Sequence, residues 1–147
     1  MYDAAVAVHV VAAIVGFGVT FSYPVIQRVA ERRGLDAAAT GLETVLAISR
    51  WVAVPAALVV GATGVYQLVD GPYSLADRWL SASLALYLGV LAVAVAYLAP
   101  AYARARDAAR RGSEAEYASA GRGIRIVGPI VAAAIVAIAV LMEVKPG

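Results

Sequence analysis

Cysteine is absent from the 147 residues, and histidine and lysine occur once each, as His9 and Lys145. The lack of cysteine excludes disulfides, thiolate metal sites and a cysteine nucleophile. Charged residues make up 15% of the chain, against about 25% in an average soluble domain. Because a small domain leaves much of its surface in water, a chain that is 63% hydrophobic is not an ordinary soluble enzyme, a disordered chain or a nucleic-acid-binding module. Composition therefore points to lipid as the solvent.

Four stretches of the chain carry no charged side chain, and they hold 24, 19, 25 and 17 residues. A helix that crosses a bilayer needs about 20 mostly apolar residues, within a range of about 17–25. The sequence therefore predicts an all-α integral membrane protein, an antiparallel four-helix bundle that forms a single domain over residues 1–147. The predicted spans are about 4–27, 44–69, 79–100 and 124–144.

Arginine is distributed unevenly among the links between these spans. Nine arginines fall in the links after the first and third spans, whereas the other side has only Arg78 and Lys145. Because cytoplasmic loops carry an excess of Lys and Arg, both arginine-rich links are predicted to be cytoplasmic and both termini to face outward. The expected location is the plasma membrane, or the inner membrane of a bacterium.

Small residues in a membrane bundle favour the buried faces, and bulky apolar residues favour the lipid. Helical spacing then predicts one narrow seam on each span, and on the first span it places Val10, Ile14, Phe17 and Phe21 on the lipid side. The seams are Tyr2, Ala5, His9, Ala13, Gly16 and Thr20; then Glu43, Arg50, Val54, Ala57, Gly61 and Gly64; then Ala82, Ala85, Gly89, Ala92 and Ala96; and last Arg125, Pro129, Ala132, Val136 and Glu143. Such seams allow close packing within the chain or between two copies, so a homodimer is also predicted.

His9 lies about two turns into the first span, on its seam. Imidazole can ligate haem iron or another metal, or carry a proton, while an interhelical hydrogen bond explains the residue equally well. Tyr87 and Glu143 are polar residues near the same side and complete a candidate cofactor site. A single histidine cannot supply two haem ligands, so the second would be a tyrosine, Glu143, Lys145, a small molecule or His9 of a second protomer. As a copper site, His9 has only two methionines as soft partners.

A second set of polar residues lies toward the inner side and consists of Glu43, Arg50 and Arg125. Arg50 is one or two turns inside the predicted boundary, two turns from Glu43 on one helix face. Its side chain can extend to the headgroups, or it can pair with Glu43. Such a pair would hold an anionic substrate or simply fix the helix packing.

Several short motifs occur in a characteristic order: Met1-Tyr2-Asp3, His9, Arg50-Trp51, Pro55, Gly64, Asp70-Gly71-Pro72-Tyr73-Ser74 and Lys145-Pro146-Gly147. In order and spacing the chain resembles an uncharacterised bacterial family of four-helix membrane proteins, domain of unknown function 2269. The resemblance covers essentially the whole chain. It implies the architecture and leaves function open.

A more distant resemblance is carried by His9 on the first span, Pro24, Arg50 before Pro55, Pro129 and the ending Val144-Lys145-Pro146. These features are similar to HemJ-type protoporphyrinogen oxidases and CopD-type copper-resistance membrane proteins. The resemblance implies b-type haem at His9. The chain lacks the lysine-containing stretch typical of the HemJ type at the inner end of span two, so haem or porphyrin binding is expected rather than porphyrinogen oxidation.

Three functions are consistent with these residues. The first is a haem- or porphyrin-binding, redox-linked membrane protein that uses His9. The second is a small oligomeric transporter or channel with its path between protomers. The third is a non-catalytic accessory subunit that binds lipid or a partner. The residues do not decide whether the protein is an enzyme.

Overall fold

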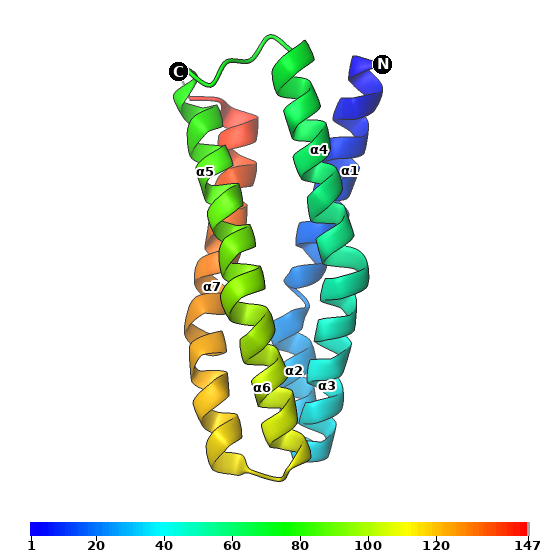
Figure 1. Cartoon of the computed structure of the whole chain (residues 1–147), viewed down its shortest axis with the longest axis vertical. Helices are drawn as coiled ribbons and strands as arrows, with labels where there is room; N and C mark the ends of the chain where they lie inside the picture. Colours follow the sequence, from blue (N-terminus) through cyan, green and yellow to red (C-terminus); the bar gives the residue numbers. More distant parts are fainter. Residues whose placement is uncertain (147) are drawn as a thin grey trace.

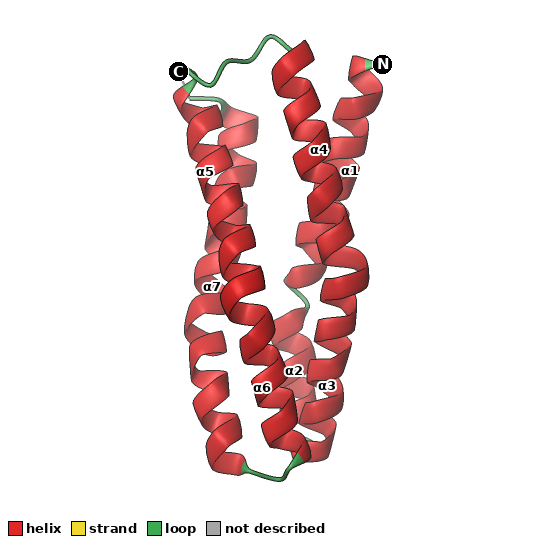
Figure 2. Cartoon of the chain, viewed as in Figure 1, coloured by secondary structure: helices red, strands yellow, loops and turns green. Residues whose placement is uncertain are grey.

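The computed structural model describes residues 1–146, which form helices joined by short turns (Figure 2). The helices combine into four long rods, of 30, 36, 33 and 31 residues. The elements are α1 (Tyr2–Thr20), α2 (Tyr23–Glu31), α3 (Leu35–Ile48), the π-helical turn η1 (Ser49–Ala53), α4 (Val54–Asp70), α5 (Arg78–Val93), the π-helical turn η2 (Ala94–Leu98), α6 (Ala99–Arg110) and α7 (Glu114–Val144).

The four rods pack antiparallel, each against the next in the chain, as Figure 1 shows. The first rod is α1 and α2, the second α3 to α4, the third α5 to α6, and the fourth α7. Each rod is long and apolar enough to cross a membrane. The predicted all-α bundle of four apolar helices is therefore confirmed, and each predicted span falls inside one rod.

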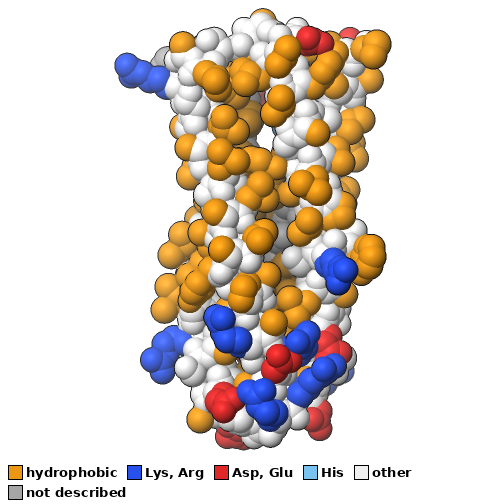
Figure 3. Space-filling view, in the orientation of Figure 1, with side chains coloured by type: hydrophobic (Ala, Val, Ile, Leu, Met, Phe, Trp, Pro, Cys, Tyr) orange, Lys and Arg blue, Asp and Glu red, His pale blue; other side chains and the backbone are white. Residues whose placement is uncertain are grey.

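The rods are longer than a bilayer requires. At about 1.5 Å per residue they measure roughly 45–54 Å, whereas the hydrocarbon core of a bilayer is about 30 Å thick. Charged side chains gather at the lower end in Figure 3, which contains the turns at 32–34 and 111–113 and which we call the arginine end. The opposite end carries both termini and the 71–77 loop, and we call it the terminal end.

Prolines account for the irregular turns inside three of the rods. Each π-helical turn ends two residues before a proline, Pro55 in one rod and Pro100 in the other. In the first rod, Pro24 is the second residue of α2, which follows a break in the rod. Proline has no N–H and clashes with the carbonyl four residues back, so the preceding turn widens or breaks. Pro129 is accommodated inside α7, which continues past it.

The core is closest packed toward the arginine end. Its main cluster contains Tyr23, Leu42, Val45, Leu98, Ala101, Tyr102, Ala105 and Ile124. Alanines from α3 and α6, such as Ala38 and Ala105, are almost fully buried there, so the two backbones lie close together. This part of the bundle joins all four rods.

The terminal half consists of two helix pairs. There α1 packs along α4, and α5 packs along α7. The extensive contacts between the second and third rods lie in the other half of the bundle, between α3 and α6. Figure 1 shows the two pairs side by side above the tighter lower half. Phe17 connects them, because it packs against Val90, Ile135 and Ile138.

The predicted seam of the first span is confirmed, since all six of its residues are buried or half-buried. The prediction that Phe17 faces the lipid is wrong, because the side chain packs inward between the two pairs. The seam predicted on the third span is not buried within the chain: Ala82, Ala85, Gly89, Ala92 and Ala96 are all exposed, and α5 instead buries Trp79, Ser83 and Val90.

The fourth span departs from its predicted seam in the same way. Arg125, Pro129, Val136 and Glu143 are exposed, whereas Ile124, Ile135 and Ile138 are buried. The seam of the second span is mixed, because Arg50 and Val54 are exposed while Ala57 is buried. In lipid, packing fit rather than residue size selects the contact face, so bulky side chains fill the interior wherever they interlock.

Candidate functional site

His9 is half-buried on the face of α1 that contacts α4, and its ring forms a hydrogen bond with Thr63. The His9 Nδ1 and Thr63 Oγ1 atoms are 2.9 Å apart. Thr63 Oγ1 is also 2.6 Å from the carbonyl oxygen of Val59, one turn back on α4. The three groups form a short chain from the imidazole to the helix backbone.

These hydrogen bonds indicate which nitrogen of the neutral imidazole carries the hydrogen. A hydroxyl has one hydrogen to donate, and the short contact to the Val59 carbonyl uses it. In the arrangement that satisfies both contacts, His9 Nδ1 donates its own hydrogen to Thr63 Oγ1. In a neutral imidazole the other nitrogen, Nε2, is left with a lone pair and is available as an acceptor or a ligand.

Two glycines on α4 make room for the polar residues of the terminal half. A Cβ atom at Gly64 would lie 3.4 Å from His9 Cε1, and one at Gly61 would lie 2.9 Å from the hydroxyl of Tyr87. That hydroxyl donates a hydrogen bond of 2.6 Å to the carbonyl of Ala57. Tyr87 therefore crosses from α5 to α4, about one turn nearer the middle of the rod than His9.

Figure 3 shows a hollow between the α1/α4 pair and the α5/α7 pair toward the terminal end. Glu143 does not share the environment of His9 and Tyr87, because it is exposed on α7. The structure thus brings His9 and Tyr87 to one wall, that of α4, and leaves Glu143 on the protein surface.

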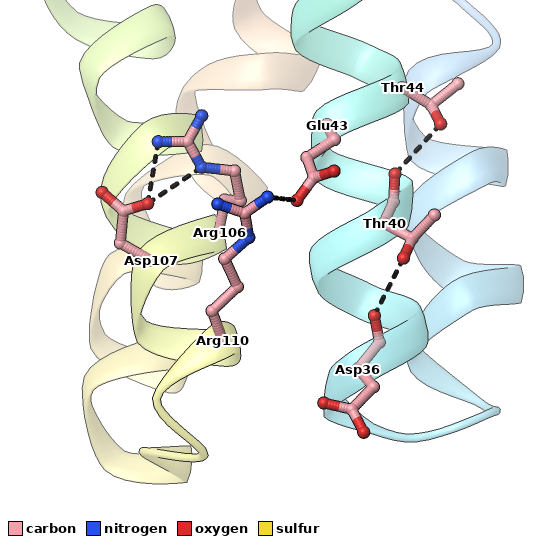
Figure 4. Close-up of polar contacts among 7 residues, drawn as sticks. All are labelled: Asp36, Thr40, Glu43, Thr44, Arg106, Asp107 and Arg110. Atoms are coloured by element: carbon pink, nitrogen blue, oxygen red, sulfur yellow. Dashed lines mark hydrogen bonds and ion pairs between the residues drawn. The ribbon is translucent and has the colours of Figure 1, made fainter.

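The inner polar residues lie apart from one another. Glu43 forms an ion pair of 2.5 Å with Arg110 of α6 (Figure 4). The guanidinium of Arg50 lies 5.5 Å from the ring of Trp51, and it is exposed, as expected for a side chain that extends to the headgroups. Arg125 donates a hydrogen bond to the carbonyl of Ala118 on its own helix.

Two of these contacts involve residues that sequence reasoning did not single out. Thr63 is a common helix residue, and its position relative to His9 follows only from the rotation of α4. Arg110 is one of nine link arginines and is distinguished only by its proximity to Glu43. Residues 1–146 contain no group of three or more His, Cys, Asp or Glu side chains that could hold a metal ion. If His9 binds a metal, no cluster of such side chains within residues 1–146 completes the site.

Comparison with known proteins gives one match. A family model described as "Predicted integral membrane protein (DUF2269)" matches residues 4–146. No curated protein and no solved structure matches the chain. The four apolar rods imply contact with a lipid bilayer, and the homodimer stays a prediction.

Proposed function

We propose that this chain, which belongs to the DUF2269 family of predicted integral membrane proteins, binds a haem or a related porphyrin through His9. The observation that carries the proposal is the hydrogen-bond chain from His9 to Thr63 to the Val59 carbonyl. Histidines that ligate metals nearly always donate their other ring N–H to such a partner, which fixes the ring and raises its basicity. The distant resemblance to HemJ-type proteins supports the same ligand.

The residues around His9 fit such a group. Its Nε2 is the free nitrogen, and imidazole is a common axial ligand of haem iron. The adjacent wall of α4 has glycines at positions 61 and 64, which let Tyr87 and the imidazole of His9 lie close to the helix. The hollow between the helix pairs lies in the same half of the bundle (Figure 3).

Each residue has a distinct role in this proposal. His9 supplies the ligand, and Thr63 holds the imidazole in the tautomer that leaves Nε2 free. Tyr87 bounds the site toward the middle of the rod, with its hydroxyl already donated to Ala57. A bound haem would supply one-electron redox chemistry. Glu143 is exposed on α7, so His9 is the residue that would hold the group in this proposal.

The test is the absorption spectrum of the purified protein, taken before and after addition of haemin. We expect a Soret band that His9→Gly removes and that added imidazole restores in this variant. Thr63→Val keeps the ligand but loses its orienting partner, so haemin affinity should fall by about 10–100-fold. Val65→Ala, an exposed change on the same helix, is the matched control and should leave the spectrum unchanged.

Two outcomes would overturn the proposal. One is protein that stays colourless and takes up no haemin, and the other is haemin binding that His9→Gly leaves intact. Transport between protomers, or an accessory role without a cofactor, would then account better for the fold.

We also infer that the arginine end faces the cytoplasm of the plasma or bacterial inner membrane, because nine of the twelve basic residues lie in its two links. The chain has no cysteine, so single probes can be introduced at Ser74 in the terminal-end loop and at Ser113 at the arginine end. In intact cells a membrane-impermeant maleimide should label Ser74→Cys and spare Ser113→Cys. The reverse pattern would invert the topology.

A further inference from the structure

The outward surface of α2 and α3 near the arginine end combines an open groove with unpaired arginines. The groove encloses about 530 Å³, and Val25, Ile26, Val29, Ala30, Arg33, Ala37, Thr40, Gly41 and Thr44 line it. This volume falls within the range of about 300–1,000 Å³ that is usual for ligand sites. Its floor is closed where α2 and α3 approach most closely, since a Cβ at Gly41 would lie 2.7 Å from Ala30 Cβ.

The walls of the groove are apolar even where threonine lines them. The hydroxyl of Thr40 donates to the carbonyl of Asp36, and that of Thr44 donates to the carbonyl of Thr40, as Figure 4 shows. Both hydroxyls are thus bonded within α3. On the other wall Val25 and Val29 are 62% and 48% exposed, a large apolar surface for a helix that contains Arg28 and is followed directly by Arg32 and Arg33.

The charge beside the groove is unbalanced. Among residues 1–146, Arg28, Arg32 and Arg33 have no carboxylate within 4 Å, and the one acid of α2, Glu31, accepts a hydrogen bond from Tyr117 of α7. Among the described residues of this end, three arginines of the link after α5 and α6 are paired: Arg106 with Asp107, Arg110 with Glu43, and Arg111 with Glu116. Arg104, Arg122 and Arg125 have no such partner, but they do not line the groove.

The position of α2 along its rod relates these two features to the bilayer. The uncharged stretch of the first rod ends at Arg28, so residues 24–27 lie on the apolar side of this point and residues 28–33 on the charged side. A second depression, lined by Pro24, Val25, Arg28, Val29 and Arg32, flanks the same valine ridge. Arginines therefore line the depressions on both sides of an exposed apolar ridge, at the point where the uncharged stretch of the first rod ends.

We infer that this surface, the α2–α3 groove, is a binding site for one anionic phospholipid. An acyl chain would lie against Val25, Ile26 and Val29, and the phosphate would face the guanidinium groups of Arg28, Arg32 and Arg33. Arginine suits this task because its planar fork of donors matches phosphate oxygens in pairs. The positive charge of the arginines favours an anionic lipid over a zwitterionic one. The groove gives one lipid molecule a defined place on the protein, which the bulk lipid around the bundle does not have.

The test is native mass spectrometry of the whole protein in detergent, titrated with phosphatidylglycerol or with phosphatidylcholine of the same acyl chains. We expect a one-to-one adduct with phosphatidylglycerol, whose affinity should exceed that for phosphatidylcholine by about tenfold or more. A tenfold difference in affinity corresponds to about the free energy of one charge-assisted hydrogen bond. Glycerophosphate, which has the headgroup phosphate without acyl chains, should not compete at millimolar concentration.

Two variants separate the phosphate contact from the groove. Arg32→Gln with Arg33→Gln should lower phosphatidylglycerol affinity about tenfold or more and should remove most of the preference over phosphatidylcholine. Thr40→Trp places a bulky side chain on an exposed groove position and should abolish the adduct with the charges intact. Arg104→Gln with Arg122→Gln, two exposed arginines on α6 and α7, is the matched control and should bind as the wild type does.

Elution of each variant at the wild-type volume in gel filtration shows that it is folded. The inference is overturned if both lipids bind equally, if the Arg32 and Arg33 double variant keeps its phosphatidylglycerol adduct, or if the control variant loses it to the same extent. Competition by glycerophosphate would also overturn it, because a free phosphate site would then account for the arginines.

Discussion

The two helix pairs of the terminal half reach close packing by opposite means. Where α1 meets α4 the backbones approach closely, and a Cβ at Gly16 would lie 2.6 Å from Ala56 Cβ. Where α5 meets α7 large side chains interlock instead, with Val90, Ile135 and Ile138 forming the cluster. Both pairs belong to apolar rods, so the difference lies in geometry and not in hydrophobicity.

The comparison shows what small residues mean in a membrane bundle. Beside α4, Gly16 permits a contact that a larger residue would block, and its row faces inward. On α5 a similar row that includes Gly89 faces outward, and no protein atom other than its own near neighbours lies within 4 Å of a Cβ built there. Glycine is thus necessary at the close approach of α1 to α4, whereas no contact within the chain requires it on the outward face of α5.

The largest expected effect is in the α5/α7 pair. Ile135→Ala leaves a cavity in the interlocked cluster and should lower the free energy of unfolding by about 2–5 kcal/mol. The measurement is SDS titration of the protein in mild detergent, followed by circular dichroism. Gly89→Leu, on the outward face of α5, is the control and should stay within about 0.5 kcal/mol of the wild type. If Gly89→Leu were less stable than Ile135→Ala, the conclusion would reverse, and the row of small residues on α5 would be its contact face.

A smaller effect is expected in the α1/α4 pair, from added rather than removed volume. Gly16→Ala forces the helices apart and should cost about 1–3 kcal/mol, even though alanine is the better helix former. Gly18→Ala on the same helix meets no atom within 4 Å and should be neutral or stabilise the protein by up to about 1 kcal/mol. The same titration compares the two variants, and equal responses would contradict a close contact specific to Gly16.

The candidate site was predictable only in part. The spacing of small residues correctly placed His9 on the inward face of α1, because a single helix fixes the angular relation of its own residues. The partner of His9 could not be predicted in this way. Thr63 reaches the imidazole because of how α4 is rotated about its axis, and α4 also has apolar residues on its outer face.

The charged residues illustrate the same limit. Glu43 and Arg50 share a rod, and their spacing along it allows a pairing, yet Glu43 pairs with Arg110 from another rod. That contact depends on α3 and α6 packing through buried alanines, which brings long side chains from both helices within reach of each other. The alternative of an exposed Arg50 was foreseeable, since a long cationic side chain reaches the headgroups at little cost.

The sequence by itself determined that the protein has four apolar rods, that its positive charge is concentrated at one end, and that His9 faces inward. These properties depend on the length of uncharged runs and on the periodicity within one helix. Only the tertiary structure decided which faces of α5 and α7 are buried, which group holds the imidazole of His9, and where α2 and α3 leave a groove. The reason is physical: when a helix is apolar all round, burial does not fix its rotation, and the interlocking of side chains between rods makes that choice.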